Sequence, residues 1–454
     1  MASGIKGGAE AAIHAMSEIF HSEATDAVIL VDASNAFNRL NRMVALHNIQ
    51  YICHPFSQAI INTYRASARL FLTGGGEIKS LEGTTQGDPL AMQFYALGMR
   101  PLLSLLHAKV HEVKQVWLAD DASGAGKLGK LRIWWDTVIQ EGAKFGYFVN
   151  QSKSWLILKN QDQQEEANVI FENTEIKITS AGKRHLGAAI GSNDFKSEYI
   201  SDKVAQWTGE IEKLSILAES QPQAAYSAYI HGYQHKFRYF LRTIPDISEE
   251  LRPLDEAISN RLIPAIIGSQ VGEIERDLMS LPIRHGGMGI ESPSIIADHE
   301  YTRSKLITGP LATIIALQGT CIPDTEIQRQ LLLPDNDEVQ QVKKDVTNMK
   351  SESLKQTIHQ IDQILPAEVH RNLIQAREQG ASNWLSALPL EKHGFTLNKL
   401  EFRDAIALWY NRHLENLPSL CVCGTKFDVT HAMNCKRGGF INVRHDGIRD
   451  FESS

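Results

Sequence analysis

Two short stretches decide the fold of this chain: Val31-Asp-Ala-Ser-Asn-Ala-Phe-Asn38 and Trp117-Leu-Ala-Asp-Asp-Ala122. Each places an aspartate at the end of an apolar, strand-like run, residues 27–31 in the first and residues 116–118 in the second. Two such strands lying side by side would bring Asp32, Asp120 and Asp121 together. Three carboxylates repel one another unless cations lie between them, and oxygen-rich carboxylate clusters suit Mg²⁺. Because paired Mg²⁺ ions promote in-line transfer at phosphorus, the two stretches predict a metal-dependent nucleotidyl transferase.

Composition sets broad limits. The chain has 454 residues, which predicts about three domains, and its 43% hydrophobic and 22% charged residues are typical of globular proteins. It shows neither a signal peptide nor an apolar run long enough to span a bilayer, so we expect a soluble intracellular protein with no membrane partner. The net charge of −7 argues against a broadly basic surface. A nucleic-acid enzyme of this charge would need a locally positive groove.

The pattern of apolar residues predicts alternating strands and helices up to about residue 192. We expect helices over residues 9–20, 35–48, 89–106 and 128–142, and short strands over residues 24–31, 154–158 and 176–178. Gly74-Gly75-Gly76 between residues 68–72 and 77–81 predicts a hairpin. A second hairpin joins residues 112–118 to a strand beginning near Ala122. Beyond residue 192 the pattern is helical, with helices expected over residues 199–219, 223–241, 249–267 and 294–317.

The sequence between the two aspartate stretches identifies a family resemblance. Gly83-Thr-Thr-Gln-Gly-Asp-Pro-Leu90 lies directly before an expected helix. In order, these three motifs resemble the reverse transcriptase palm of non-LTR (LINE-type) retrotransposons. The resemblance continues in residues 142–153 and in His185-Leu186-Gly187, which is similar to the motif that opens the primer-grip region. An isolated aspartate after a strand is more often a helix N-cap, but four motifs in the same order favour the metal site.

The resemblance implies an α+β fold and a division into four parts. Residues 1–192 would form a reverse transcriptase palm, a small antiparallel sheet with helices, and residues 193–333 a helical thumb and connector. Residues 334–416 would be a helical linker region, and residues 417–454 a small zinc-binding segment. The implied function is RNA-directed DNA polymerase, with an RNA template, a DNA primer and dNTPs as partners and two Mg²⁺ ions as cofactors.

The resemblance also assigns roles to single residues. Asp32 and Asp120 would bind both Mg²⁺ ions, and Asp121 would support them. Phe37 matches the steric-gate position, where a bulky ring clashes with a ribose 2′-hydroxyl; the alternative is a core phenylalanine on the first turn of a helix. Lys153 would contact phosphate or protonate pyrophosphate, the alternative being a solvated surface lysine.

The Gln-Gly pair of the middle motif has an expected role as well. Gln86 would line the template or nucleotide pocket, and Gly87 would let the backbone approach the base pair closely. The alternative for Gly-Asp-Pro is an ordinary turn before a helix, because proline favours the first helical turn.

A second constellation lies near the end of the sequence. Cys421, Cys423, His431 and Cys435 are spaced as ligands of tetrahedral Zn²⁺. Lys436 and Arg437 beside them suit a small knuckle that binds nucleic acid. Similar segments in retroelement proteins lie between the reverse transcriptase and a restriction-like endonuclease.

Three departures from the family pattern leave other functions open. Leu118 stands where the family has an aromatic residue, only 31 residues precede Asp32 where the fingers would lie, and the sequence stops soon after the cysteines. We therefore expect a polymerase module truncated at both ends. The alternative is a catalytically inactive retroelement relic that binds nucleic acid without polymerising it. A metal-dependent nuclease built on the three aspartates is a third possibility, which would make Phe37 and Gln86-Gly87 coincidences.

Overall fold

The computed structural model describes residues 7–85, 87–318, 337–414, 417–437 and 440–452. It divides into two compact units, which we describe separately. Unit 1 comprises residues 1–210, 233–257 and 292–356, and unit 2 comprises residues 211–232, 258–291 and 357–454. Strands and helices mix in unit 1, and a small sheet carries the predicted motifs, so the expected α+β class is confirmed. Among the helices of the described residues, none combines the length and apolar content needed to cross a membrane.

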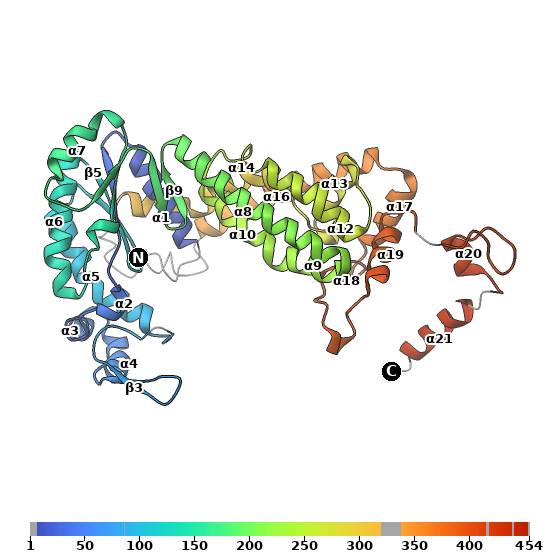
Figure 1. The fold of residues 1–454 in the computed structure, drawn as a ribbon, viewed down its shortest axis with the longest axis horizontal. Coiled ribbons are helices and arrows are strands. Elements are labelled where there is room, and N and C mark those ends of the chain that lie inside the picture. Colours follow the sequence, from blue (N-terminus) through green and yellow to red (C-terminus); the bar gives the residue numbers. More distant parts are fainter. Residues whose placement is uncertain (1–6, 86, 319–336, 415–416, 438–439, 453–454) are drawn as a thin grey trace. The chain divides into compact units, whose positions relative to one another are not determined.

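The sheet of unit 1 has β1 at its centre. Its strands are, in spatial order, β4 (Lys114–Leu118), β5 (Asp121–Gly126), β1 (Ala27–Val31), β6 (Trp155–Leu158) and β7 (Lys177–Thr179). β1 runs antiparallel to both β5 and β6, and β7 joins β6 in parallel. The expected antiparallel sheet is therefore present, with one parallel pairing at its edge. Figure 1 shows β5 of this sheet between α6 (Leu128–Phe145) and α1 (Gly8–His21).

β1 is buried on both faces, and its residues alternate between two cores. Ala27, Ile29 and Val31 contact the larger core, formed with α5 (Ala91–Lys109) and α6 (Leu128–Phe145). Val28 contacts a second core, to which α1 (Gly8–His21) contributes Met16 and Phe20. An entirely apolar strand is what a position between two helical layers requires, because neither face meets water.

One expected helix is broken in two. Residues 35–48 were expected to be a single helix, but α2 (Ala36–Arg39) ends before Leu40, and α3 (Arg42–Ile52) begins after Asn41. The Asn41 side chain explains the break, because its Oδ1 accepts a hydrogen bond from the Val44 N–H at 3.1 Å and caps α3.

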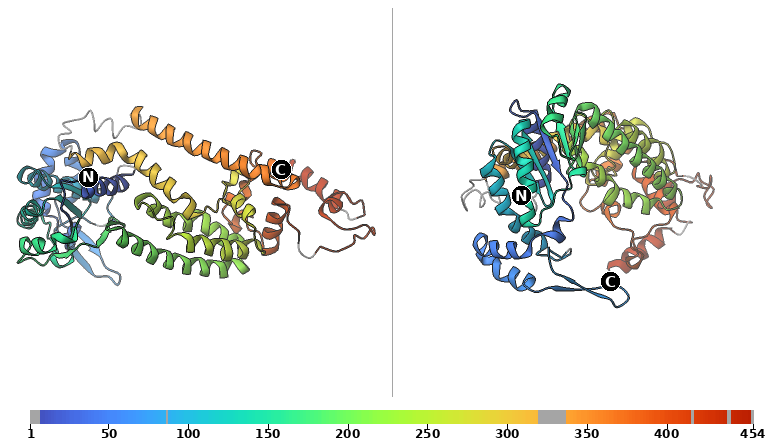
Figure 2. Two further views of the ribbon diagram at one scale, coloured as in Figure 1. Left: turned by 90° about the horizontal axis from the view of Figure 1, so that it is seen from above. Right: turned by 60° about the vertical axis from the view of Figure 1, so that its left-hand side comes forward.

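The expected glycine-rich hairpin is present. α4 (His54–Tyr64) leads into β2 (Ala68–Phe71), which pairs with β3 (Glu77–Ser80). Figure 2 shows this hairpin extending away from the rest of unit 1.

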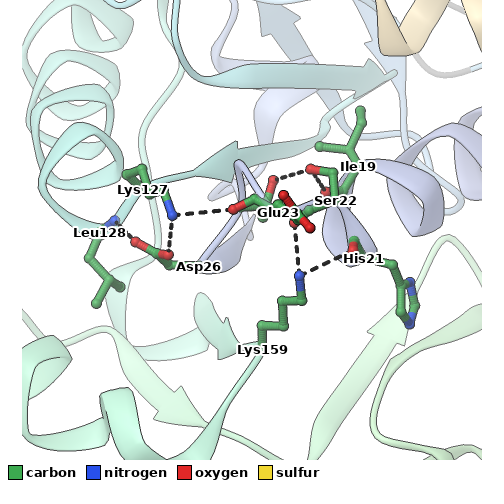
Figure 3. A network of polar contacts seen from close by, with 9 residues as sticks. Ile19, His21, Ser22, Glu23, Asp26, Lys127, Leu128 and Lys159 are labelled. Carbon is green, nitrogen blue, oxygen red and sulfur yellow. Dashed lines mark hydrogen bonds and ion pairs between the residues drawn. The ribbon is translucent and has the colours of Figure 1, made fainter.

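A polar network fastens the end of the sheet that lies opposite Asp32 (Figure 3). Lys127 binds the Asp26 carboxylate at 2.8 Å, and the other carboxylate oxygen accepts from the Leu128 N–H at 3.3 Å. Lys159 donates to the carbonyls of His21 and Ser22 at 3.1 and 2.8 Å. These contacts join the end of α1, the start of α6 and the end of β6. They hold in place the elements around the first residue of β1, at the end of the strand opposite Asp32.

The rest of unit 1 adds a hairpin and several helices. β8 (Gly182–His185) and β9 (Ala188–Gly191) form an antiparallel hairpin at the position of the expected primer-grip motif. The remaining helices that lie wholly or partly in this unit are α7 (Gln164–Ile170), α8 (Asn193–Ser220), α10 (Gln234–Thr243), α11 (Arg252–Ala257), α14 (Pro293–Ala316) and α16 (Asp337–Ile364).

Unit 2 is helical around a turn-rich connector, residues 281–290. Its helices are α9 (Pro222–Ala228), α12 (Ile263–Ile267), α13 (Glu273–Ser280), α17 (Ala367–Ala376), α18 (Asn383–Ser386), α19 (Lys399–Trp409), α20 (Val429–Asn434) and α21 (Phe440–Glu452). In the connector a Cβ on Gly287 would lie 1.9 Å from the Leu281 carbonyl oxygen, so only glycine fits there. The Tyr226 hydroxyl donates to the Met288 carbonyl at 2.7 Å, which anchors the connector on α9.

The larger core of unit 1 gives a stability prediction. Trp134 of α6 is fully buried, and a Cβ placed on Gly124 of β5 would meet its ring at 3.1 Å. We expect Trp134→Ala to lower the free energy of unfolding by about 3–5 kcal/mol, because it leaves a cavity under the sheet. Urea denaturation measures this loss. Ile133→Ala is the matched control, since that neighbouring side chain is 51% exposed; an equal loss in both variants would contradict the prediction.

Candidate active site and metal centre

The register of the sheet brings the two aspartate motifs to one end. Val31 at the end of β1 pairs with Ala122 of β5, so Asp32 and Asp121 directly beyond that pair are neighbours. Leu118 of β4 pairs with Asp121, which leaves Ala119 and Asp120 as the turn between β4 and β5. Ala119 takes a left-handed backbone conformation there, with φ at 56°. The structure therefore brings together the three aspartates that the sequence singled out.

The charges of the three carboxylates interact. Partial desolvation raises the pKa of Asp121 above its ordinary value, the charges of Asp120 and Asp32 raise it further, and Arg184 opposes the shift. Mutual repulsion of this kind is what a bound cation relieves. Among the described residues, the ligand atoms gathered closely enough to hold a metal ion belong to a group of cysteines and a histidine, and the three aspartates are not part of that group. The donor set of carboxylate oxygens fits Mg²⁺.

Buried hydroxyls fix the backbone around the acids. The Asp32 N–H donates to Ser154 Oγ at 3.1 Å, and the Asp32 carbonyl accepts from the Asn150 N–H at 2.8 Å. Behind the turn, the Tyr147 hydroxyl donates to the Asp120 carbonyl at 3.0 Å. Burial raises the pKa of Tyr147 well above its ordinary value, so the hydroxyl stays a neutral donor. Lys153 is exposed in the short 3₁₀ turn Gln151–Lys153, next to the segment that binds Asp32.

Phe37 lies on α2, five residues after Asp32. Its ring is partly buried and packs on Tyr95 of α5, with ring centroids 4.5 Å apart. Tyr95 itself is 1% exposed, and its hydroxyl finds no hydrogen-bond partner among the described residues. Sequence reasoning missed Tyr95. The available signal was its place on the helix after Pro89, whose apolar face had to meet the helix that carries Phe37.

The middle motif forms a loop against α2. Gln86 lies outside the described residues, so its expected role stays a prediction. Gly87 is exposed with φ at 91°, a conformation that favours glycine. Asp88 accepts from the Leu90 N–H at 2.8 Å and from the Tyr64 hydroxyl at 2.6 Å. The Asp88 contacts match the alternative of a turn before a helix, while the backbone of Gly87 is open to a ligand.

The β8–β9 hairpin adds a cation near the acids, and a second cation on Trp155. Arg184 is close enough to lower the pKa of Asp121, and Lys183 Nζ lies 3.8 Å from the centre of the Trp155 ring. The hairpin turn is held from α10 and α8, because the hydroxyls of Tyr239 and Tyr199 donate to the carbonyls of Leu186 and Gly187. Sequence reasoning identified the turn but not the two basic residues directly before it.

The predicted cysteine and histidine ligands form a cluster in unit 2. One ligand atom from each of Cys421, Cys423, His431 and Cys435 lies within 4.8 Å of the others, so this group could hold a metal ion. Cys421 Sγ is 3.6 Å from Cys435 Sγ, and Cys423 Sγ is 3.1 Å from His431 Nε2. Hydrogen bonds from Thr425 lower the pKa of Cys423 to about 6, which favours the thiolate. Three sulfurs and one imidazole nitrogen fit tetrahedral Zn²⁺.

Comparisons with known proteins give a weak similarity to solved structures. No protein-family model matches the chain, and no curated protein does. Among solved structures, telomerase from Candida albicans, in complex with a fragment of telomeric RNA, aligns with 70% of this chain at a TM-score of 0.32 and 10% sequence identity. The chain spans 55% of that telomerase chain.

The cysteine and histidine cluster predicts that each chain binds one metal ion. We expect the purified chain to bind one Zn²⁺, and Co²⁺ in its place to give the absorption bands of thiolate ligation. Cys435→Ser should remove both signals, because it leaves three of the four ligands. Cys53→Ser is the control, since Cys53 belongs to unit 1 and the cluster belongs to unit 2. Metal binding that persists unchanged in Cys435→Ser would contradict the assignment.

Repulsion among the aspartates predicts a stability gain. A raised pKa in the folded chain means that protonated Asp121 stabilises the fold, so this contribution is lost as pH rises through the raised pKa. At pH 7 without divalent ions, Asp121→Asn should therefore raise the free energy of unfolding, by less than about 1 kcal/mol because solvent screens the charges. Thermal unfolding with and without Mg²⁺ measures this. Asp162→Asn, an exposed aspartate beyond the other end of β6, should change nothing.

Proposed function

We propose that this chain is the reverse transcriptase module of a non-LTR retrotransposon, an RNA-directed DNA polymerase that extends a DNA primer with deoxynucleotides. One observation supports the proposal most. Asp32 and the pair Asp120-Asp121 come from separate strands and converge at one end of the sheet, and Phe37 follows on the next helix. A carboxylate cluster beside a bulky ring suits transfer of a nucleotide whose sugar must be selected.

The acids would hold two Mg²⁺ ions. When bound, these ions lower the pKa of a primer 3′-hydroxyl and neutralise the leaving pyrophosphate. Asp32 and Asp120 would supply the ligands to both ions, and Asp121 would support them from the start of β5. Lys153, exposed beside the segment bound to Asp32, would contact a phosphate or give a proton to pyrophosphate.

Phe37 would select the sugar. Its ring cannot swing into the core, because Tyr95 already fills the space beneath it at 4.5 Å. A ring held in that position would meet a 2′-hydroxyl and favour deoxynucleotides. The open backbone at Gly87 would lie against the new base pair, with Gln86 beside it.

The other parts of the chain would handle the nucleic acid. We propose residues 1–192 as the palm, 193–333 as thumb and connector, 334–416 as a helical linker region and 417–454 as a zinc knuckle. The knuckle carries Lys426, Lys436 and Arg437, cations that suit phosphate contacts with the RNA template or the DNA primer.

Primer extension tests the proposed activity. With an RNA template, a DNA primer, dNTPs and Mg²⁺, we expect the chain to add deoxynucleotides and Asp120→Asn to add none above background. The substitution keeps the shape of the side chain and removes one charged metal ligand. Asp162→Asn is the control for a lost surface carboxylate and should extend as the unchanged chain does.

Each other outcome favours a different function. Equal extension by the chain and Asp120→Asn would overturn the catalytic assignment. Binding of the template–primer duplex with no extension would favour a nucleic-acid-binding relic. Loss of template without nucleotide addition would favour a nuclease built on the same aspartates.

A further inference from the structure

Arg42 is a buried cation that grips the backbone ahead of the middle motif. It is 4% exposed at the start of α3. Its guanidinium donates to the Gly83 carbonyl at 3.0 Å, the Ser80 carbonyl at 2.9 Å, Ser80 Oγ at 3.0 Å and the Glu82 carbonyl at 2.9 Å. The Arg42 N–H also donates to a carboxylate oxygen of Glu82 at 2.9 Å. A single side chain therefore fixes residues 80–83.

The gripped residues are in turn bound to the helix that carries Phe37. The Gly83 N–H donates to the Leu40 carbonyl at 3.0 Å, and the Thr84 N–H donates to the Phe37 carbonyl at 2.7 Å. Gly83 lies so close to α2 that a Cβ there would be 2.4 Å from the Phe37 carbonyl oxygen. Arg42 is thus connected to the backbone of Phe37 through two successive residues, Gly83 and Thr84.

The chemistry of arginine suits this task better than that of lysine. A guanidinium offers five donors in a rigid plane, and here it makes four hydrogen bonds to three residues of the loop, Ser80, Glu82 and Gly83. Burying such a charge is costly unless its donors are satisfied. Because all these donors must be satisfied, the buried Arg42 holds residues 80–83 in a single conformation. That conformation places the Thr84 N–H against the Phe37 carbonyl.

We propose that Arg42 is a positioning residue, which holds Phe37 in the position from which its ring distinguishes deoxyribose from ribose. This inference rests on the proposed polymerase function. Arg42 acts through Gly83 and Thr84 and touches no nucleotide. A shift of about 1 Å in a positioned group can change rates about 100-fold, so loosening the grip should act on sugar selection more than on chain extension.

The test compares two arginine-to-lysine substitutions. Arg132 of α6 also holds backbone, by donating to the carbonyls of Ile170 and Glu172 at the end of α7 at 2.7 and 3.1 Å, and α7 packs on β7 at the edge of the sheet opposite β4. We measure kcat and KM for one dNTP and the matching rNTP in primer extension. For Arg42→Lys we expect the preference for dNTP over rNTP to fall about tenfold or more, mainly through a lower KM for rNTP, because a loosened Phe37 ring clashes less with the 2′-hydroxyl. Arg132→Lys should keep the preference.

Hydrogen exchange tests the structural role of Arg42 separately from its role in sugar selection. Arg42→Lys should speed amide exchange at residues 82–85 and leave residues 182–191 unchanged, whether or not the chain polymerises. Ser80→Ala, which removes one acceptor, serves if Arg42→Lys does not fold. Unchanged exchange at residues 82–85 would overturn the grip, and faster exchange with an unchanged sugar preference would overturn the role in selection. If the chain without any substitution adds no nucleotide, the proposed function and the role of Arg42 in sugar selection are both overturned. Amide exchange at residues 82–85 would still test whether Arg42 holds the loop.

Discussion

The pairing of β1 with β5 is the constraint on which the candidate site depends. Val31 opposite Ala122 is the last pair of this ladder, and it makes neighbours of two aspartates that lie far apart in the sequence. A slip of one residue would turn every side chain of β1 to the opposite face. Both faces of β1 are buried in different cores, so the packing of Ile29 on one side and Val28 on the other prevents such a slip. The hydrophobic register thus fixes the position of the carboxylates.

The same frame supports the groups around the acids. Backbone hydrogen bonds join the Asp32 segment to Asn150 and Ser154, and Tyr147 supports the turn that carries Asp120. The middle motif is docked on α2 by Gly83, Thr84 and the Arg42 grip. These hydrogen bonds hold the loops that carry the three aspartates at one end of the sheet. The like charges therefore do not push the loops apart. The same hydrogen bonds also explain why an acidic chain can present a defined local site, with Arg184 as a nearby cation.

Much of the fold could be predicted because the signals were local. The apolar run 27–31, the glycines before Glu77 and the ligand spacing of the cysteines each specify a nearby structure, and each is found as expected. The break at Asn41 was missed because apolar residues continue on both sides of it, and the cap appears only once its side chain meets Val44. Arg42 and Tyr95 were missed for a different reason. Their partners lie tens of residues away, so no spacing in the sequence marks Arg42, and only the place of Tyr95 on the helix after Pro89 indicated a contact with the helix that carries Phe37.

Cleavage of the backbone by bound iron tests most directly whether the two aspartate motifs hold a divalent ion together. Fe²⁺ can take a Mg²⁺ site of oxygen ligands, and with ascorbate and peroxide it generates radicals that cut the nearest peptide bonds. We expect cuts near residue 32 and near residue 120 in the same sample, both suppressed by excess Mg²⁺ and both absent in Asp32→Asn. Cuts at only one of the two positions, or cuts that persist in Asp32→Asn, would contradict a shared metal site at the end of β1.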